Sequence, residues 1–288
     1  MSGRAFSILL LLAAVLIWGS TYVITKTGVE EVPPMLFALL RYCVASLLLA
    51  PLALLRARPL RGSPPPPATL VLMGLTGVAL YYAGFNLSLT YTTASQGALV
   101  QSSIPAVTAI LAVVWLRERL SARRMLGIGL AIVGVMLVVA GAPSDDGARA
   151  PLVGNLLMCG TVLTWGVYTM LAKRVAGTDA IAVTAAVSVI GTVMLIPAAL
   201  AEAAGAPTPA ISADAWLRII YLGALPSAAG YLLYNRALRD LDASQVGAFT
   251  NLSPVIGAVS GVVFLGETIT PLAIGGGVTA LVGVWMCR

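Results

Sequence analysis

Histidine is absent from this chain of 288 residues, and charged residues make up only 10% of it. Without histidine, the sequence lacks the commonest metal ligand and the commonest proton shuttle. So little charge excludes an ordinary soluble domain, in which about 25% of the residues are charged. Hydrophobic residues make up 59% of the chain and form continuous runs, which predicts a helical integral membrane protein rather than a barrel.

Acidic residues are missing from the middle of the apolar runs. All eleven lie in loops or at the ends of expected helices, so we expect no mid-membrane carboxylate that binds a proton or sodium. Neither Lys26 nor Lys173 follows a glycine, so there is no Walker A motif and we expect no ATP site. We interpret both lysines as helix-end side chains that extend to the membrane surface, with binding of a substrate carboxylate as the alternative. Arg41, inside an apolar run, is also interpreted as extending to the surface.

Cysteine is scarce. Cys43, Cys159 and Cys287 lie in or at the end of apolar runs, and an odd number of cysteines offers no disulfide framework. We expect them to be small buried hydrophobic side chains, and we predict neither a metal site nor a cofactor. The first apolar run, 6–25, has about the 20 residues needed to span a membrane, and we interpret it as a retained helix rather than a cleaved signal peptide.

The chain repeats itself internally. A shift of 149 residues aligns the first half with the second without a gap, so that Ala94-Ser95-Gln96 falls on Ala243-Ser244-Gln245. The same shift pairs Gly74 with Gly223, Tyr82 with Tyr231, Asn86 with Asn235, Pro105 with Pro254, Glu118 with Glu267, Gly127 with Gly276 and Gly134 with Gly283. Each copy has five long apolar segments, and an odd number of spans inverts the second copy. Inverted repeats are typical of transporters that bind their substrate between the halves, near the membrane midplane.

We therefore predict an all-α integral membrane protein with ten transmembrane helices in two inverted five-helix repeats. The first repeat is expected at 1–141 and the second at 152–288, with a linker at 142–151. The ten helices are expected at 6–26, 34–55, 69–90, 95–116, 123–140, 152–172, 180–201, 215–238, 243–265 and 270–287.

The distribution of Lys and Arg predicts the orientation. With Arg41 left out, thirteen basic residues fall at the ends and loops on the side of the N-terminus, and only three, Lys26, Arg149 and Arg218, fall on the other side. Cytoplasmic loops have the excess of basic residues, so we expect both termini in the cytoplasm of a protein in the cell inner membrane. Because the net charge of +6 is explained by these loops, we expect a lipid bilayer as partner and no nucleic acid.

Several short motifs resemble a known family. Trp18-Gly19-Ser20 and Trp165-Gly166 lie near the start of the two halves, Ala-Ser-Gln precedes the fourth helix of each, and LRERLS (116–121) and LGETIT (265–270) follow it. With two five-helix halves, the chain resembles the EamA branch of the drug/metabolite transporter superfamily over nearly its whole length. Within that branch it most resembles the YddG-type exporters of aromatic amino acids. The resemblance implies a transporter that exports small organic metabolites, aromatic amino acids first.

Aromatic and amide side chains recur on single faces of four expected helices. Because polar groups inside a bilayer are costly, such faces indicate a binding cavity, with packing between helices or an interfacial aromatic belt as the alternative. The expected substrate-binding residues on these faces are Trp18 and Tyr22; Tyr82, Phe85 and Asn86; Trp165 and Tyr168; and Tyr231, Tyr234 and Asn235.

Two prolines lie at equivalent places in the expected helices 95–116 and 243–265. A proline inside a helix leaves the carbonyl four residues earlier without its hydrogen bond, here in Gln101 and Thr250, and such carbonyls could bind an ammonium group. A plain kink is the alternative. We expect Pro105 and Pro254 to act as hinges and the preceding polar residues to line the substrate site: Gln101, Ser102, Asn251 and Ser253.

Glycines are concentrated in the expected fifth and tenth helices. Small residues allow close helix packing, which we expect within each half, with a dimer interface as the alternative. The glycines are Gly127, Gly129, Gly134, Gly275, Gly276, Gly277 and Gly283.

The leading hypothesis is a carrier that moves a small-molecule substrate by alternating access. Aromatic faces could stack on a substrate ring, and they also attract flat cations, so other amino acids and cationic drug-like compounds remain alternatives. A channel-like pore is the alternative from another class. An enzyme is not expected, because the chain has no histidine and no mid-membrane acid–base pair.

Overall fold

The computed structural model describes residues 3–55, 65–116, 121–142, 149–175, 178–205, 210–237, 249–250 and 252–286, with only the backbone of 3–5, 113, 116 and 235–237. Every regular element in these ranges is a helix. Seven helical stretches there are long and apolar enough to cross a membrane: Phe6–Gly28, Pro34–Leu55, Pro67–Tyr91, Ala122–Ala140, Pro151–Arg174, Ala180–Ala204 and Ala213–Tyr234. The prediction of an all-α protein with several apolar spans is therefore confirmed.

The helices of the first half follow the expected order, with one break. They are α1 (Gly3–Gly28), α2 (Pro34–Leu55), α3 (Pro67–Gly74), η1 (Leu75–Ala79), α4 (Leu80–Tyr91), α5 (Ala94–Gln101), α6 (Ile104–Leu116) and α7 (Ala122–Ala140). The predicted helix 34–55 is confirmed as α2, and α3, η1 and α4 form the expected third helix without interruption. The predicted single helix 95–116 is wrong, because a turn at Ser102 and Ser103 divides it into α5 and α6.

The second half contains α8 (Pro151–Arg174), α9 (Ala180–Ala204), α10 (Ala213–Ala224), η2 (Leu225–Ala229), α11 (Gly230–Ala237), α13 (Leu252–Leu265) and α14 (Pro271–Met286). The predicted helix 243–265 agrees with the structure from Leu252 onward, and its segment 243–248 lies outside the described residues. Thus α13 and α14 are shorter apolar helices than the seven long stretches.

Side-chain caps begin several of these helices. The hydroxyl of Thr93 accepts from the Gln96 backbone N–H at the start of α5, and Asp179 accepts from the Ile181 N–H at the start of α9. Such caps satisfy backbone donors that have no partner inside the helix. At the start of α10, Ser212 donates its own N–H and hydroxyl to the exposed Glu31, which holds the pKa of that carboxyl below its ordinary value.

Two π-helical turns lie at almost equivalent places in the two halves. η1 begins at Leu75 and η2 at Leu225. The 149-residue shift that aligns the two halves places the start of η1 one residue before the start of η2. Such turns add a residue to the helical turn and are frequent at functional sites. A side chain at Gly77 of η1 would overlap the ring of Tyr168, so this glycine lets α8 approach closely.

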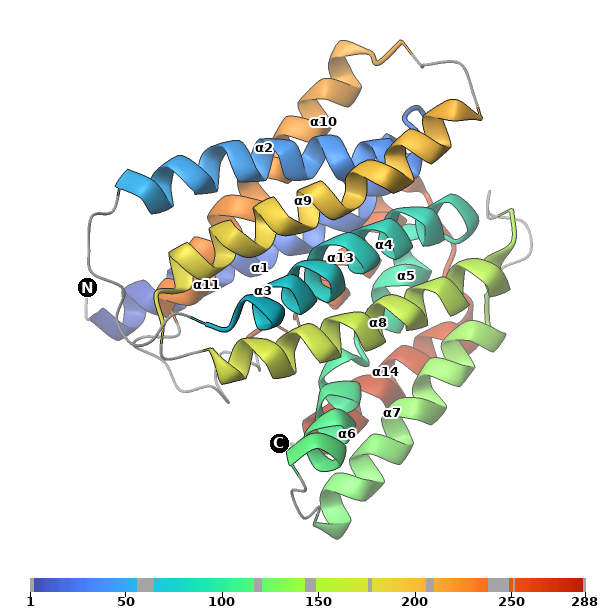
Figure 1. Cartoon of the computed structure of the whole chain (residues 1–288). Coiled ribbons are helices and arrows are strands. Elements are labelled where there is room, and N and C mark those ends of the chain that lie inside the picture. The colour runs from blue at the N-terminus through green and yellow to red at the C-terminus, as the bar shows by residue number, and fades with distance from the viewer. Residues whose placement is uncertain are drawn as a thin grey trace.

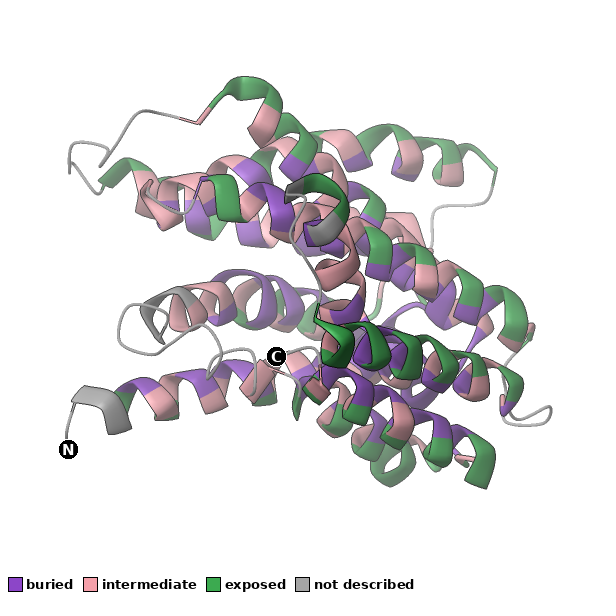
Figure 2. Cartoon of the chain, turned by 90° about the horizontal axis from the view of Figure 1, so that it is seen from below, coloured by how far each residue is buried: buried purple, intermediate pink, exposed green. Residues whose placement is uncertain are grey.

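Figure 1 shows how the helices of the two halves interleave. α2 packs along α9, α4 along α8, and α1 along α11 and α13, while α7 and α14 form a steeply inclined pair with α6. Residues that face neighbouring helices are buried, and the outer faces are exposed (Figure 2). Large apolar side chains cover these outer faces, among them Leu47, Leu126, Val133, Leu200 and Phe264. Lipid is a suitable environment for such a surface.

The glycines of α7 and α14 form a contact between the halves. A Cβ atom at Gly134 would overlap the backbone of Ala280, and one at Gly276 would lie 2.6 Å from the Gly134 carbonyl oxygen. Gly283 likewise meets the backbone of Ala131. The expectation that these glycines serve packing within each half is therefore wrong, because α7 and α14 belong to different halves. Gly129 and Gly275 have no neighbouring atom within 4 Å of such a Cβ.

We predict that Gly134→Ala destabilises the protein, since the added methyl group would push α7 away from α14. Overpacking of this kind costs about 1–3 kcal/mol. The measurement is the temperature at which purified protein in detergent loses its monodisperse peak in size-exclusion chromatography. Gly129→Ala is the matched control in the same helix, and its unfolding temperature should equal or slightly exceed that of the wild type. Equal temperatures for wild type and Gly134→Ala would contradict the close contact.

Candidate functional site

Aromatic side chains of both halves meet in one continuous cluster, which we call the ring cluster. Neighbouring rings in it have centroids 4.7–6.4 Å apart, the spacing of interacting aromatic pairs. Its members are Trp18, Tyr22, Tyr42, Tyr81, Tyr82, Phe85, Trp165, Tyr168, Tyr231 and Tyr234. The structure thus brings together all eight aromatic residues that the sequence singled out, and it adds Tyr42 and Tyr81.

Trp165 on α8 connects the rings from the first half of the chain with those from the second. Its ring lies 4.8 Å from that of Tyr81 on α4, 5.0 Å from that of Tyr168 and 6.4 Å from that of Tyr231 on α11. Trp18 on α1 then extends the cluster, with its ring 5.8 Å from Tyr231 and 5.4 Å from Tyr234. Each tryptophan therefore contacts rings on helices of the other half.

The indole of Trp18 is held by the η2 turn. Its Nε1 donates a hydrogen bond of 3.0 Å to the carbonyl of Pro226, a residue of that turn. A side chain at Gly230, directly after η2, would lie 2.8 Å from the same nitrogen. The π-helical turn and the glycine after it together make the space for the indole.

Gln101, at the end of α5, is the polar centre of one side of the cluster. Its Oε1 accepts from the hydroxyl of Tyr81 at 2.9 Å and from that of Tyr22 at 3.4 Å. Its Nε2 donates to Thr161 of α8 at 3.2 Å and lies 3.3 Å from the sulfur of Met158. The side chain of Gln101, rather than a carbonyl exposed by proline, connects this residue to the aromatic rings.

The remaining predicted site residues lie less centrally. Asn86 donates from Nδ2 to the carbonyl of Pro34 at 3.0 Å, and its Oδ1 is buried without a hydrogen-bond partner. Ser102 donates to the carbonyl of Leu99 at 2.6 Å, and Ser253 is buried near the start of α13. The side chain of Asn235, and Asn251 altogether, lie outside the described residues.

Pro105 lies in the first turn of α6, and Pro254 is the third residue of α13 as the structure describes that helix. The expectation that Pro105 interrupts a helix interior is wrong, because the chain already turns at Ser102 and Ser103. A first-turn backbone nitrogen has no intrahelical acceptor, so proline removes no hydrogen bond at this position.

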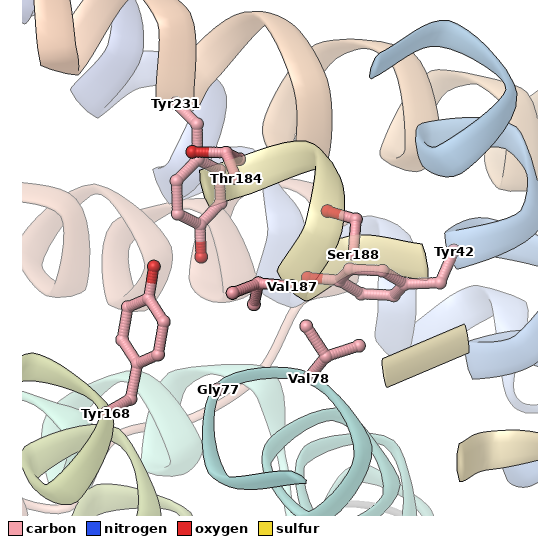
Figure 3. Close-up of a pocket in the computed structure, with 8 residues that line it drawn as sticks. All are labelled: Tyr42, Gly77, Val78, Tyr168, Thr184, Val187, Ser188 and Tyr231. Carbon is pink, nitrogen blue, oxygen red and sulfur yellow. The ribbon is translucent and has the colours of Figure 1, made fainter. Parts of the chain in front are cut away.

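A small cavity lies beside the ring cluster (Figure 3). Tyr42, Tyr168 and Tyr231 point their hydroxyls toward its middle from α2, α8 and α11. Its other lining residues are Gly77, Val78, Thr184, Val187 and Ser188. The space open to the centre of a water molecule is about 10 Å³, which is room for about one water. A ligand larger than water therefore does not fit this cavity as the helices are arranged.

Arg41 on α2 lies next to the ring cluster and is buried, with 1% of its surface exposed. Its Nε donates to the hydroxyl of Ser227 on η2 at 2.9 Å, and its guanidinium carbon lies 4.3 Å from the centre of the Tyr82 ring. The interpretation that Arg41 extends to the membrane surface is wrong. Helical periodicity in the sequence could not reveal this contact, because Ser227 is 186 residues away from Arg41.

Two more charged side chains are buried, each against the end of another helix. Lys26 donates from Nζ to the carbonyls of Leu89 and Thr92, at 2.8 and 3.0 Å. The interpretation that Lys26 extends to the membrane surface is therefore wrong. Glu267 accepts from the backbone N–H groups of Ala94 and Ser95, both at 2.7 Å. Lys173 is exposed at the end of α8, and its extension to the membrane surface stays a prediction. Cys43 and Cys159 are half-buried free thiols.

A family model described as the EamA-like transporter family matches this chain twice, at residues 5–140 and 152–288. The chain belongs to the EamA-like transporter family. Its members are transporters and not enzymes, so the ring cluster and its cavity lie in a multi-pass membrane transporter.

Curated relatives agree with this family. An "Uncharacterized transporter YetK" of Bacillus subtilis is 29% identical over 89% of this chain and 79% of its own length. A "Probable terminal-alkyne amino-acid exporter" of Streptantibioticus cattleyicolor is 29% identical over 96% and 91%. A "Probable amino-acid metabolite efflux pump" of Salmonella typhimurium is 26% identical over 96% and 93%.

One solved crystal structure has the same fold. It superposes with a TM-score of 0.66 and 19% sequence identity, and the match covers 99% of this chain and 98% of that chain. At this identity the likeness concerns the fold alone.

Proposed function

We propose that this EamA-family protein is a secondary carrier that exports small organic metabolites, with aromatic amino acids as its first substrates. The observation that supports this most is the ring cluster, in which aromatic side chains of both halves surround Trp165 beside a cavity with three tyrosine hydroxyls. Rings of this kind stack on an aromatic substrate, and hydroxyls bind its polar groups.

The relatives support export of amino-acid-like molecules without giving the substrate of this chain. Two of them are named for amino-acid or amino-acid metabolite export. Non-aromatic amino acids and cationic drug-like compounds are the alternative substrates, since the faces of Trp and Tyr rings also attract cations. A channel-like pore is the alternative mechanism.

Alternating access fits the arrangement of the helices. We propose two inverted repeats of five membrane-spanning helices, at 1–141 and 152–288, joined by a linker at 142–151. The helix contacts support this, because they are symmetric between the repeats. The contact of α4 with α8 has its counterpart in that of α11 with α1, and two helices pack on their own counterparts, α2 on α9 and α7 on α14. In carriers of this type, one half rocks against the other around a central site.

We propose that both termini lie in the cytoplasm of the inner membrane. The uneven distribution of basic residues supports this orientation, since thirteen of them fall on the side of the N-terminus. A reporter enzyme active only in the cytoplasm should work when fused to residue 288 and fail when inserted into the 142–151 linker. Activity at the linker alone would invert the orientation, and activity at both would contradict the odd number of spans in the first half.

Trp165→Ala should reduce transport, because Trp165 is the ring that connects the two halves of the cluster. Loss of one aromatic partner is worth about 1 kcal/mol, so the affinity for the substrate should fall several-fold. The measurement is uptake of labelled phenylalanine by purified protein in liposomes, with counterflow against internal unlabelled substrate to distinguish a carrier from a channel.

The matched control is Trp216→Ala, since Trp216 on α10 is 41% exposed and outside the ring cluster. Uptake by this variant should equal that of the wild type. Equal uptake by folded Trp165→Ala would mean that the cluster is structural packing. Flux that neither saturates nor shows counterflow would favour the channel.

We propose that the chain bends near Pro105 and Pro254 when the carrier changes its facing state. The turn at Ser102 and Ser103, directly before α6, supports a bend in the first half. Proline fixes the backbone angle φ, so alanine at either position loosens the chain at that bend. By the symmetry of inverted repeats, Pro105→Ala and Pro254→Ala should favour opposite facing states. Labelling of single introduced cysteines from each side, in a variant without the native cysteines, measures the bias. A shift to the same side in both variants would contradict the paired hinges.

A further inference from the structure

Arg41 is a buried cation for which the described part of the chain provides no carboxylate. Its Nη1 has no hydrogen-bond partner, its Nε donates to the neutral hydroxyl of Ser227, and its Nη2 lies 3.5 Å from the hydroxyl of Tyr82. An unpaired charge at this depth is costly, and such charges in membrane helices mark functional sites.

Apart from Glu30, which is exposed after the end of α1, the acidic residues that the structure describes are engaged elsewhere. Asp214 pairs with Arg218, and the carboxylates of the others accept hydrogen bonds from Ser212 or from backbone N–H groups at helix starts. These others are Glu31, Asp179, Glu202 and Glu267. None of the acidic residues that the structure describes forms an ion pair with Arg41.

Arg41 is adjacent to the wall of the cavity. Tyr42, the next residue in the chain, lines the cavity and has its ring 4.7 Å from that of Tyr82. Tyr82 in turn lies beneath the guanidinium and belongs to the ring cluster. The guanidinium thus contacts the ring cluster directly through Tyr82, and the neighbouring residue Tyr42 reaches the cavity.

We propose that Arg41 binds the carboxylate of the transported molecule. This proposal rests on the proposed function and narrows its substrate class to molecules with both an aromatic ring and a carboxylate. The planar guanidinium offers Nη1 and Nη2 to two carboxylate oxygens, a geometry that arginine favours. Cationic drug-like compounds without a carboxylate are then poor substrates, because they would place a second positive charge beside Arg41.

Binding of three related probes tests the proposal on the wild-type protein. L-phenylalanine has a ring, a carboxylate and an ammonium group; 3-phenylpropionate lacks the ammonium group; phenethylamine lacks the carboxylate. Each is used to compete with labelled L-phenylalanine, or to shift the unfolding temperature of the purified protein. The two carboxylates should bind roughly tenfold or more tightly than phenethylamine, as expected for a charged hydrogen-bonded pair. Equal binding of phenethylamine, or no binding of either carboxylate, would overturn the proposal.

Substitution of Arg41 separates binding from a structural role. Arg41→Gln should weaken both carboxylate probes roughly tenfold or more, and it should bind phenethylamine more tightly than the wild type does, because the repelling charge is gone. Arg41→Lys, which keeps the charge but not the planar pair of donors, should give an intermediate loss and replaces Arg41→Gln if that variant does not fold. Arg218→Gln, at an exposed ion pair, is the control and should bind all probes as the wild type does.

The outcomes distinguish this proposal from the transport function. An equal loss for all three probes in Arg41→Gln would mean that Arg41 only supports the fold of the site, and would overturn carboxylate binding. If the carboxylates bind through Arg41 but none is taken up by liposomes, the binding assignment stands and the proposed transport fails. Uptake of phenethylamine equal to that of phenylalanine would leave the carrier intact and overturn the role of Arg41.

Discussion

Polar groups buried in this helical bundle must find partners within the protein, because the hydrocarbon of a bilayer offers none. Glu267 meets this constraint by accepting from the first two N–H groups of α5, and Lys26 by donating to carbonyls at the end of α4. Glu267 lies in the second half and its two donors in the first. Glu267 therefore fixes the contact between the halves at one defined point, by neutralising the start of α5, whereas Lys26 joins two helices of the first half.

The same constraint explains why the neighbourhood of Arg41 differs from the rest. Lys26 satisfies its charge with helix-end carbonyls, whereas Arg41 has a hydroxyl and an aromatic face. These partners orient the guanidinium without cancelling its charge. A protein that retains such a group next to a cavity keeps an electrostatic attraction for anions there. The aromatic rings alone would favour cations. The site therefore combines groups that attract cations, the rings, with a group that attracts anions, Arg41.

Much of the site followed from periodicity, because helical spacing alone determines which residues share a face. Trp18 and Tyr22, or Tyr231 and Tyr234, lie on one face by their spacing, and the structure brings these faces together in the ring cluster. What periodicity does not contain is the identity of the facing helix. For this reason the glycines were assigned to packing within each half, although Gly134 meets Gly276 across the halves.

Other features depended on contacts that are remote in the sequence or on local backbone geometry. Arg41 meets Ser227 from η2, and neither residue has a neighbour in its own segment that indicates the pairing. The sequence does not reveal the break between α5 and α6, because Pro105 suggests a kink inside a helix, whereas proline is also compatible with the first turn of one. The sequence does not indicate the π-helical turns either, since Leu75–Ala79 contains only residues that ordinary membrane helices use.

The joint between α7 and α14 has a consequence for how this protein can evolve. Here main-chain atoms touch main-chain atoms, so the outward side chains of both helices contribute nothing to the spacing of the joint. Met125, Leu126 and Val282 can therefore be exchanged for other apolar residues without altering how the two copies meet. A duplicated gene is thus able to accumulate separate changes in each copy at lipid-facing positions, while a few glycines preserve the dimensions of the assembly.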